Sequence, residues 1–222
     1  MKKLLIIAFA FISLHSFGQR WETIKGNGQV KKETRSVSNF TSLVAAGSMD
    51  VQITYGSSGD VIIEAEENLL PYIETSVEDN KLTIRTKKNV NFKSNQKMIV
   101  HVSMTKINSL QLSGSGNVNG SGAFSNDSKT DISLSGSGNL KLEFDAFKDM
   151  EIAISGSGNI DLKGNATNSI DAKISGSGNV DCANVNSKDV AAKISGSGNI
   201  KVYAENSIDA KISGSGNVYY KG

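Results

Sequence analysis

The sequence predicts an all-β protein built as a single-stranded parallel β-helix, a solenoid with coils of about 18–22 residues. Three observations lead to this fold class. The pentapeptide Ser-Gly-Ser-Gly-Asn occurs six times in the second half of the chain, at a nearly constant spacing. Apolar and polar residues alternate on both sides of each copy, which is typical of strands with one buried face. The first half carries further alternating segments.

Residues 1–18 have the composition of a signal peptide. Lys2 and Lys3 precede an apolar run from Leu4 to Leu14, and Ser16-Phe17-Gly18 offers small residues for cleavage. A membrane-spanning helix needs about 20 apolar residues, and this run is shorter. We therefore expect export to the periplasm, the outer surface or the medium, without membrane insertion after signal cleavage.

The charge and cysteine content narrow the range of partners. The full sequence has 24 basic and 22 acidic residues, so loss of Lys2 and Lys3 on cleavage would leave a neutral chain. A neutral chain without a basic stripe argues against nucleic acid as a partner. Cys182 is the single cysteine, which rules out an intramolecular disulfide. Its place among apolar residues predicts a small buried side chain rather than a nucleophile.

Residues 19–36 are expected to form an N-terminal extension or cap, and residues 37–106 degenerate coils of the main domain. Ala46-Gly47-Ser48 resembles an incomplete copy of the repeated corner, and residues 66–72 predict one helical turn that ends at Pro71. Strands are predicted in the alternating segments 48–53, 60–64, 81–85 and 98–102. Because no Pro/Ser-rich linker divides these N-terminal coils from the repeats, the two parts should form one continuous domain, residues 37–222.

Residues 107–222 predict six coils, each with one copy of the pentapeptide. An apolar residue precedes the first serine and another follows the asparagine in every copy, so two strands meet at a glycine-rich corner. Glycine permits the positive φ angles of such a corner, and asparagine tolerates them. In coils stacked about 4.8 Å apart, the asparagine side chains would form an amide ladder. These structural corner residues are Ser113, Gly114, Gly116, Asn117, Ser135, Gly136, Gly138, Asn139, Ser155, Gly156, Gly158, Asn159, Ser175, Gly176, Gly178, Asn179, Ser195, Gly196, Gly198, Asn199, Ser213, Gly214, Gly216 and Asn217.

Several motifs in order carry a resemblance to a known family. They are Gly-Ser-Met-Asp-Val at 47–51, Glu-Ala-Glu-Glu-Asn-Leu-Leu at 64–70, Leu-Thr-Ile-Arg at 82–85, the repeated pentapeptide, and Gly-Asn-Val-Tyr-Tyr at 216–220. Together they resemble the GIN domain, the head of auto-transporter adhesins, over residues 37–222. The resemblance implies a right-handed parallel β-helix in an exported protein of a Gram-negative cell envelope, and it brings no catalytic residues.

Outward-facing carboxylates are the candidate catalytic groups, since parallel β-helices include polysaccharide lyases and hydrolases. Asp161 and Asp181 occupy equivalent positions in successive coils, about 5 Å apart, near the spacing of a retaining glycosidase pair. Lys141 and Lys201 continue the same column, so a solvated ladder of complementary charges explains all four residues without chemistry. A second set has acidic residues two positions before a lysine column, and comprises Asp131, Glu151, Asp171 and Asp209 with Lys173, Lys193 and Lys211.

No residue pattern predicts a metal or another cofactor. His101 lies in a strand-like segment without the neighbours of a metal site or catalytic triad. The sequence Gly-Ser-Gly-Asn-Ile-Asp is similar to calcium-binding nonapeptides, but here the period is about 20 residues rather than nine. Trp21, Tyr219 and Tyr220 are expected to cap the ends of the stack, where open sheet edges also offer a route to a homo-oligomer.

We therefore expect an exported, adhesin-like, non-enzymatic binding module whose ligand is a glycan or a cell-surface protein. Two alternatives remain open. One is a structural or assembly protein of the cell envelope. The other is a carbohydrate-active β-helix enzyme that acts through Asp161 or Asp181.

Overall fold

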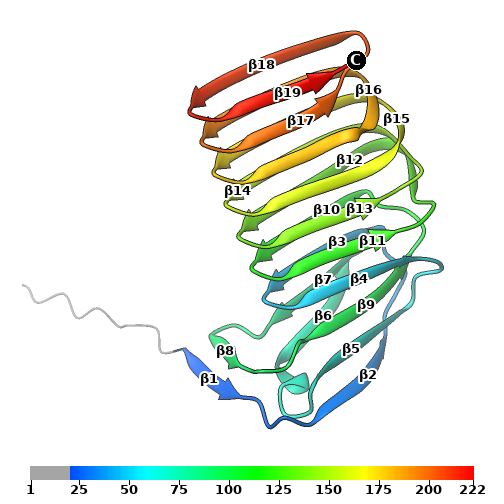
Figure 1. Cartoon of the computed structure of the whole chain (residues 1–222). Helices are drawn as coiled ribbons and strands as arrows, with labels where there is room; N and C mark the ends of the chain where they lie inside the picture. The colour runs from blue at the N-terminus through cyan, green and yellow to red at the C-terminus, as the bar shows by residue number, and fades with distance from the viewer. Residues whose placement is uncertain (1–20) are drawn as a thin grey trace, which may run out of the picture.

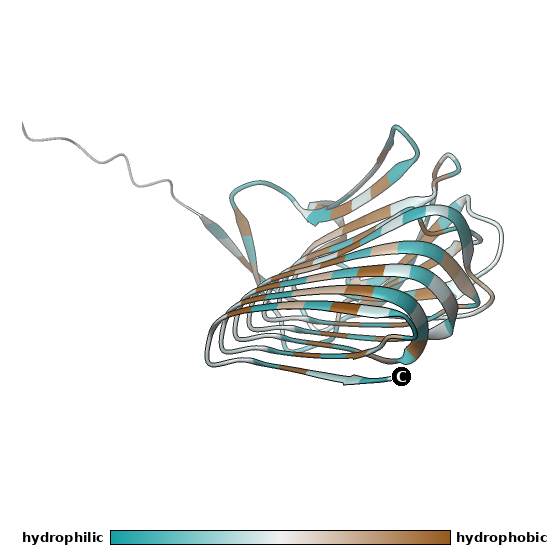
Figure 2. Cartoon of the chain, turned by 90° about the horizontal axis from the view of Figure 1, so that it is seen from above, coloured by the Kyte–Doolittle hydropathy of each residue, from teal (hydrophilic) through white to brown (hydrophobic). Residues whose placement is uncertain are grey.

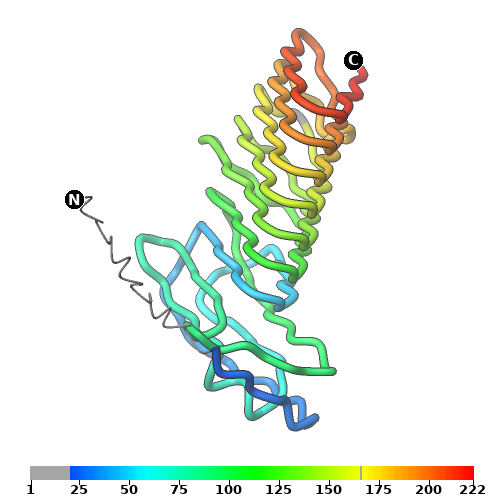
Figure 3. Tube along the Cα trace, turned by 90° about the vertical axis from the view of Figure 1, so that its left-hand side faces the viewer, coloured from blue at the N-terminus to red at the C-terminus, as the bar shows by residue number. Residues whose placement is uncertain are grey.

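The structure, a computed structural model, describes residues 21–222. The predicted signal peptide lies outside these residues. The described chain is all-β apart from one 3-10 turn, and its strands wind into a solenoid of stacked parallel coils (Figure 1), which confirms the predicted fold class. Figure 3 shows the coils stacked along one axis, with the N-terminal strands forming a broader end. No helix between residues 21 and 222 is long and apolar enough to cross a membrane.

In each regular coil, two strand segments meet at the glycine-rich corner. In β10 (Ser109–Gly114) and β11 (Asn117–Ser121), the first strand ends at the first corner glycine and the second begins at the asparagine. Each strand pairs in parallel with its counterpart one coil away. The other strands of these coils are β12 (Ser125–Gly136), β13 (Asn139–Glu143), β14 (Ala146–Gly156), β15 (Asn159–Gly176), β16 (Asn179–Gly196), β17 (Asn199–Tyr203), β18 (Ser207–Gly214) and β19 (Asn217–Lys221). Of these, β15 and β16 each run without a break from one corner to the next.

The N-terminal coils do not stack in chain order. β3 (Ser42–Gly47) and β4 (Asp50–Tyr55) form a coil that pairs with β10 and β11 on one side. On its other side the same coil pairs in parallel with the later strands β7 (Lys81–Thr86) and β9 (Ile99–Met104). The chain therefore returns beneath its own first coil before the regular repeats begin.

Three N-terminal strands run antiparallel to their partners, which differs from the degenerate coils expected through residues 37–106. β2 (Val30–Ser36) pairs with β5 (Asp60–Glu66), β5 pairs with β9, and β6 (Ile73–Glu78) pairs with β7. The cause is clearest between β6 and β7, where Asp79 and Asn80 have φ angles of 50° and 59°. Two successive positive φ angles are typical of a tight hairpin turn, which reverses the chain at once.

The remaining elements of this end are short. β1 (Glu22–Lys25) and β8 (Val90–Lys93) form a separate parallel pair. The 3-10 turn η1 spans Leu70–Tyr72, with Pro71 in its first turn. The helical turn predicted within residues 66–72 is thus present, but Pro71 lies at its start rather than its end. A proline is tolerated there because its missing N–H would have no partner in the turn.

The hydrophobic core fills the space between the two main faces of the solenoid. We call the face made of the segments that end at the corner glycine, such as β10, the first sheet, and the face made of the segments that begin at the corner asparagine, such as β11, the second sheet. Buried and more exposed side chains alternate along strands such as β10, β13 and β17, and apolar bands align from coil to coil (Figure 2). Leu110, Ile174 and Val180 are at most 3% exposed. Cys182 lies fully buried in one of these columns, and burial raises the pKa of its thiol above the ordinary value. The prediction of a small buried residue at Cys182 is confirmed.

Candidate binding surfaces

The glycine corners set the distance between coils. Gly176 has a φ angle of 127°, and a Cβ atom added there would lie 2.3 Å from the carbonyl oxygen of Gly156 in the coil below. A Cβ at Gly178 would lie 2.3 Å from the carbonyl oxygen of Gly158. Because the backbones of successive coils approach so closely at the corner, only glycine fits, and the motif serves the fold.

The corner asparagines form the predicted amide ladder. Each Nδ2 atom donates a hydrogen bond to the Oδ1 atom of the asparagine one coil below, over 2.8–3.1 Å from Asn139 to Asn217. Asn117 donates instead to the Asp50 carboxylate at 2.8 Å, so Asp50 ends the ladder. Gly47, just before it, has a φ angle of 118°, which confirms an incomplete corner copy at residues 46–48.

The charge column around Asp161 and Asp181 runs along the outer face of the second sheet. The pairing places these residues in successive coils in the order Lys141, Asp161, Asp181, Lys201 and Tyr219. Lys201 Nζ lies 3.5 Å from an Asp181 oxygen, and Asp181 Oδ1 accepts a hydrogen bond from the Ala183 backbone at 3.1 Å. Asp181 therefore has structural partners on two sides.

Tyr219 occupies the upper end of this column rather than sealing the stack. Its side chain is 54% exposed, and Tyr220 and Trp21 are also more than half exposed. Tyr219 lines a shallow hollow of about 390 Å³ together with Asp181, Lys201 and the asparagine ladder. The structure thus leaves all three expected capping residues largely open to solvent.

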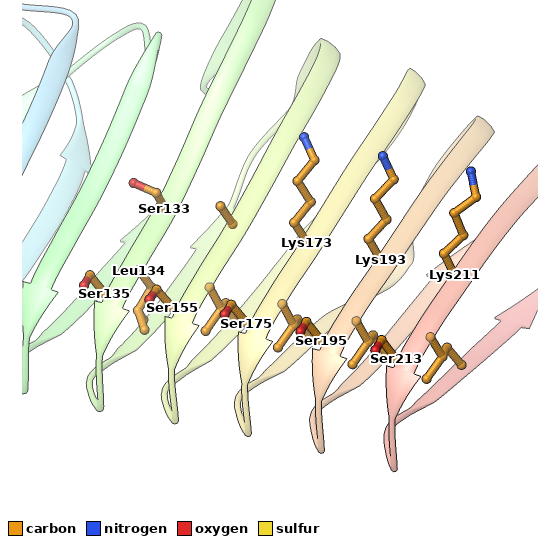
Figure 4. A pocket seen from close by; sticks show the side chains of 15 residues that line it. Ser133, Leu134, Ser135, Ser155, Lys173, Ser175, Lys193, Ser195, Lys211 and Ser213 are labelled. Atoms are coloured by element: carbon orange, nitrogen blue, oxygen red, sulfur yellow. The ribbon is translucent and has the colours of Figure 1, made fainter.

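A larger groove of about 650 Å³ runs along the outer face of the first sheet, across β12, β14, β15, β16 and β18 (Figure 4). We call it the lysine–serine groove. One wall is the column Ser133, Ala153, Lys173, Lys193 and Lys211, and the other wall is the column Ser135, Ser155, Ser175, Ser195 and Ser213. Figure 4 shows the three lysine side chains extending in the same direction, away from the serine column.

Acidic side chains flank the lysine column on the side away from the serines. Lys173 Nζ lies 2.9 Å from both Glu151 and Asp171, and Lys211 Nζ lies 3.3 Å from Asp209. Hydrogen bonds from Lys129 and Lys173 lower the pKa of Glu151 to about 2. The bonds to Glu151 and Asp171 raise the pKa of Lys173. Opposite charges thus compensate Lys173 and Lys211, as the sequence predicted for this set.

Lys193 lacks this compensation. The register places Ala191 where the neighbouring coils carry Asp171 and Asp209. Within residues 21–222, Lys193 forms no ion pair. Its ammonium group is therefore an uncompensated positive charge, with a lysine in the coil on either side.

The lysine–serine groove was missed from the sequence, although the signal was present. Lysine and serine stand two residues apart in three successive coils, and residues i and i+2 of a strand share one face. The serines were predicted as corner residues and the lysines as part of a charge ladder, and the single surface that they form together was not predicted.

No group of three or more potential metal ligands gathers in the described part of the chain. His101 lies in β9 with its side chain 42% exposed, and its Nε2 atom is 3.8 Å from a Glu64 oxygen. A lone partly exposed histidine beside one carboxylate has neither the ligand number nor the geometry of a zinc site.

Stacked parallel coils, joined by a glycine corner and an asparagine ladder, define a β-solenoid protein. The chain belongs to the family described as "Putative auto-transporter adhesin, head GIN domain", which matches residues 39–222. The resemblance found in the sequence motifs is thereby confirmed. The family description points to an exported or surface protein. No curated protein matches the chain.

Solved structures share the fold. A putative adhesin from Bacteroides fragilis is similar with a TM-score of 0.78 and 19% identity, covering 89% of this chain and 100% of that chain. A putative lipid binding protein from Parabacteroides distasonis has a TM-score of 0.69 and 21% identity, covering 90% of this chain and 100% of its own. A putative adhesin from Parabacteroides merdae has a TM-score of 0.57 and 22% identity, with the same coverage.

Proposed function

We propose that the protein is a non-enzymatic, adhesin-like binding module that presents the outer faces of its solenoid to a glycan or a cell-surface protein. The observation that carries the proposal is the lysine–serine groove, a continuous outward array assembled from five coils. The two sheets and the asparagine ladder fix the register between coils. Such an array is preorganised, and preorganisation lowers the entropic cost of binding.

The contacts of Asp181 argue against the carbohydrate-active alternative. A retaining glycosidase needs one carboxylic acid that stays protonated, and burial in an apolar site is the usual means. The Asp181 side chain is 40% exposed and pairs with Lys201. A charge ladder accounts for these contacts without a reaction.

An assembly role is the second candidate, because the last coil leaves apolar side chains exposed. Ile212, which occupies an inward column, is 47% exposed. β18 and β19 each pair with a strand on one side only within the described residues. Edge strands with unpaired backbone groups favour pairing with another chain.

The test is to incubate the purified full-length chain with an array of glycans and matrix proteins, recording retention and soluble products together. We expect retention on a ligand class without release of products. Products that disappear in Asp161→Asn and Asp181→Asn variants would establish an enzyme instead. Absence of retention, with concentration-dependent oligomers in sedimentation, would favour the assembly role.

A further inference from the structure

We propose that the lysine–serine groove binds a linear acidic polysaccharide, which lies along the solenoid axis with a carboxylate group at Lys193. This inference rests on the proposed binding function and deepens it, because it names the ligand class and the surface. The shape of the groove, the chemistry of its walls and the distribution of charge each support it.

The groove has the shape of a track for a polymer. Successive strands lie about 4.8 Å apart, so the groove extends about 19 Å from Ser135 to Ser213 and is open along its length. Every coil presents nearly the same pair of outward positions to the groove. A chain of repeating units can make the same contact in each coil, whereas a compact ligand would meet only one or two coils.

The walls suit the hydroxyl groups and C–H faces of sugar rings. The serine hydroxyls on one wall can each donate and accept a hydrogen bond. All five serines are exposed. The methylene stems of the lysines offer apolar surface beside their charged heads. The apolar residues between the two columns also line the groove, and they are Leu134, Ile154, Ile174, Ile194 and Ile212.

The charge distribution selects an acidic ligand. Lys173 and Lys211 have acidic partners at 2.9 Å and 3.3 Å, but Ala191 leaves Lys193 without one. Among the three lysines of the groove, Lys193 is therefore the one whose ammonium group can bind an external anion without giving up an acidic partner. A carboxylate beside Lys193 would form the charge-assisted hydrogen bond that Asp171 provides for Lys173 one coil below.

The open form of the groove favours a saccharide over a lipid. An acyl chain lying in a shallow surface groove would keep much of its apolar surface in water, which removes most of the driving force for burial. A hydroxyl-rich chain loses nothing by facing water on its outer side. Lipid binding is therefore an outcome that would contradict the proposal.

The experiment is a calorimetric titration of the full-length chain with linear polygalacturonate. Fully methyl-esterified polygalacturonate, which has the same backbone without charge, is the control ligand. Lys193→Gln removes the free charge, and Ala191→Asp supplies the acidic partner that the neighbouring coils already have. Lys201→Gln is the matched control variant, because it removes a lysine from the opposite sheet.

We expect both groove variants to bind polygalacturonate about tenfold more weakly, the size of one lost hydrogen bond to a charged group. Lys201→Gln should bind like the unaltered chain, and the esterified polymer should bind more weakly. If polygalacturonate binds equally well to all variants, or if only other ligands of the array are retained, the groove proposal fails while the binding function stands. Retention on oleate-containing vesicles that is lost in Lys193→Gln would replace the saccharide by a lipid. Retention on no ligand at all would overturn both proposals.

Discussion

Replacing Gly176 by alanine should destabilise the solenoid by about 2–6 kcal/mol. Two effects add at this position. A non-glycine residue at a φ angle of 127° costs about 1–3 kcal/mol in backbone strain. The new Cβ atom would also lie 2.3 Å from the Gly156 carbonyl oxygen, and such overpacking costs about 1–3 kcal/mol.

Gly178→Ala separates the two effects. Gly178 is not among the residues with positive φ, but its added Cβ would lie 2.3 Å from the Gly158 carbonyl oxygen and 2.8 Å from the Ile154 Cγ2 atom. Only the overpacking cost of about 1–3 kcal/mol applies. Ser177→Ala, between the two glycines, changes an exposed side chain and should stay within about 0.5 kcal/mol of the unaltered chain.

The assay is urea unfolding followed by far-UV circular dichroism, with the three variants compared under the same conditions. The expected order of unfolding midpoints is Ser177→Ala near the unaltered chain, then Gly178→Ala, then Gly176→Ala. If Gly176→Ala unfolds at the same urea concentration as Ser177→Ala, the close approach of the coils at the corner is not a determinant of stability, and the reasoning is refuted.

Three further predictions concern the ladder, a charged pair and the thiol. Asp50→Ala removes the acceptor of both the backbone and the side-chain N–H of Asn117. It should lower the free energy of unfolding, measured in urea, by about 2 kcal/mol, whereas Asp50→Asn should lower it less. Equal losses of stability in the two variants would contradict a ladder that ends on the Asp50 acceptor. The pKa of Glu151 is lowered from 4.5 to about 2, so its contribution to stability is complete above pH 4.5 and is lost as the pH falls towards 2. The stability difference between the unaltered chain and Glu151→Gln should therefore shrink over that range, and a difference independent of pH would show that the Glu151 ion pairs do not stabilise the fold. Cys182 is buried with a raised thiol pKa, so it should react with Ellman's reagent only after urea unfolding; reaction in native buffer would contradict its burial.

The regular coils could be predicted from the sequence because every coil repeats the environment of its neighbour. Once the pentapeptide copies are aligned, the apolar columns, the glycine corner and the asparagine ladder all follow from one register. Asp50 was within reach of the same reasoning, since it follows the incomplete corner at Gly47 in the place of an asparagine.

The N-terminal end was harder to predict because alternation of apolar and polar residues does not encode the direction of pairing. The predicted strands at 60–64 and 81–85 are present, but β5 runs antiparallel to its partners and β7 lies beneath an earlier coil. Asp79-Asn80 was the one local signal of a reversal. The insertion of β3 and β4 between later strands depends on long-range packing that no local pattern records.

The candidate surfaces could be predicted in part. The Asp161–Asp181 column follows from the register alone, and the structure adds the contacts of Asp181 with Lys201 and Ala183. The free charge of Lys193 depends on the absence of an acidic residue at Ala191. The missing carboxylate at position 191 can be recognised in the sequence only once Asp171 and Asp209 have been identified as the partners of the lysines in the neighbouring coils.

The most direct test of a binding module that acts through its outer face is lysine footprinting. The full-length chain would be acetylated with and without a retained glycan, and the reactivity of each lysine compared by mass spectrometry. We predict protection of Lys173, Lys193 and Lys211, unchanged reactivity of Lys141 and Lys201, and recovery of the glycan at its original length. Unchanged reactivity of all five lysines, or recovery of a shortened glycan, would contradict the account.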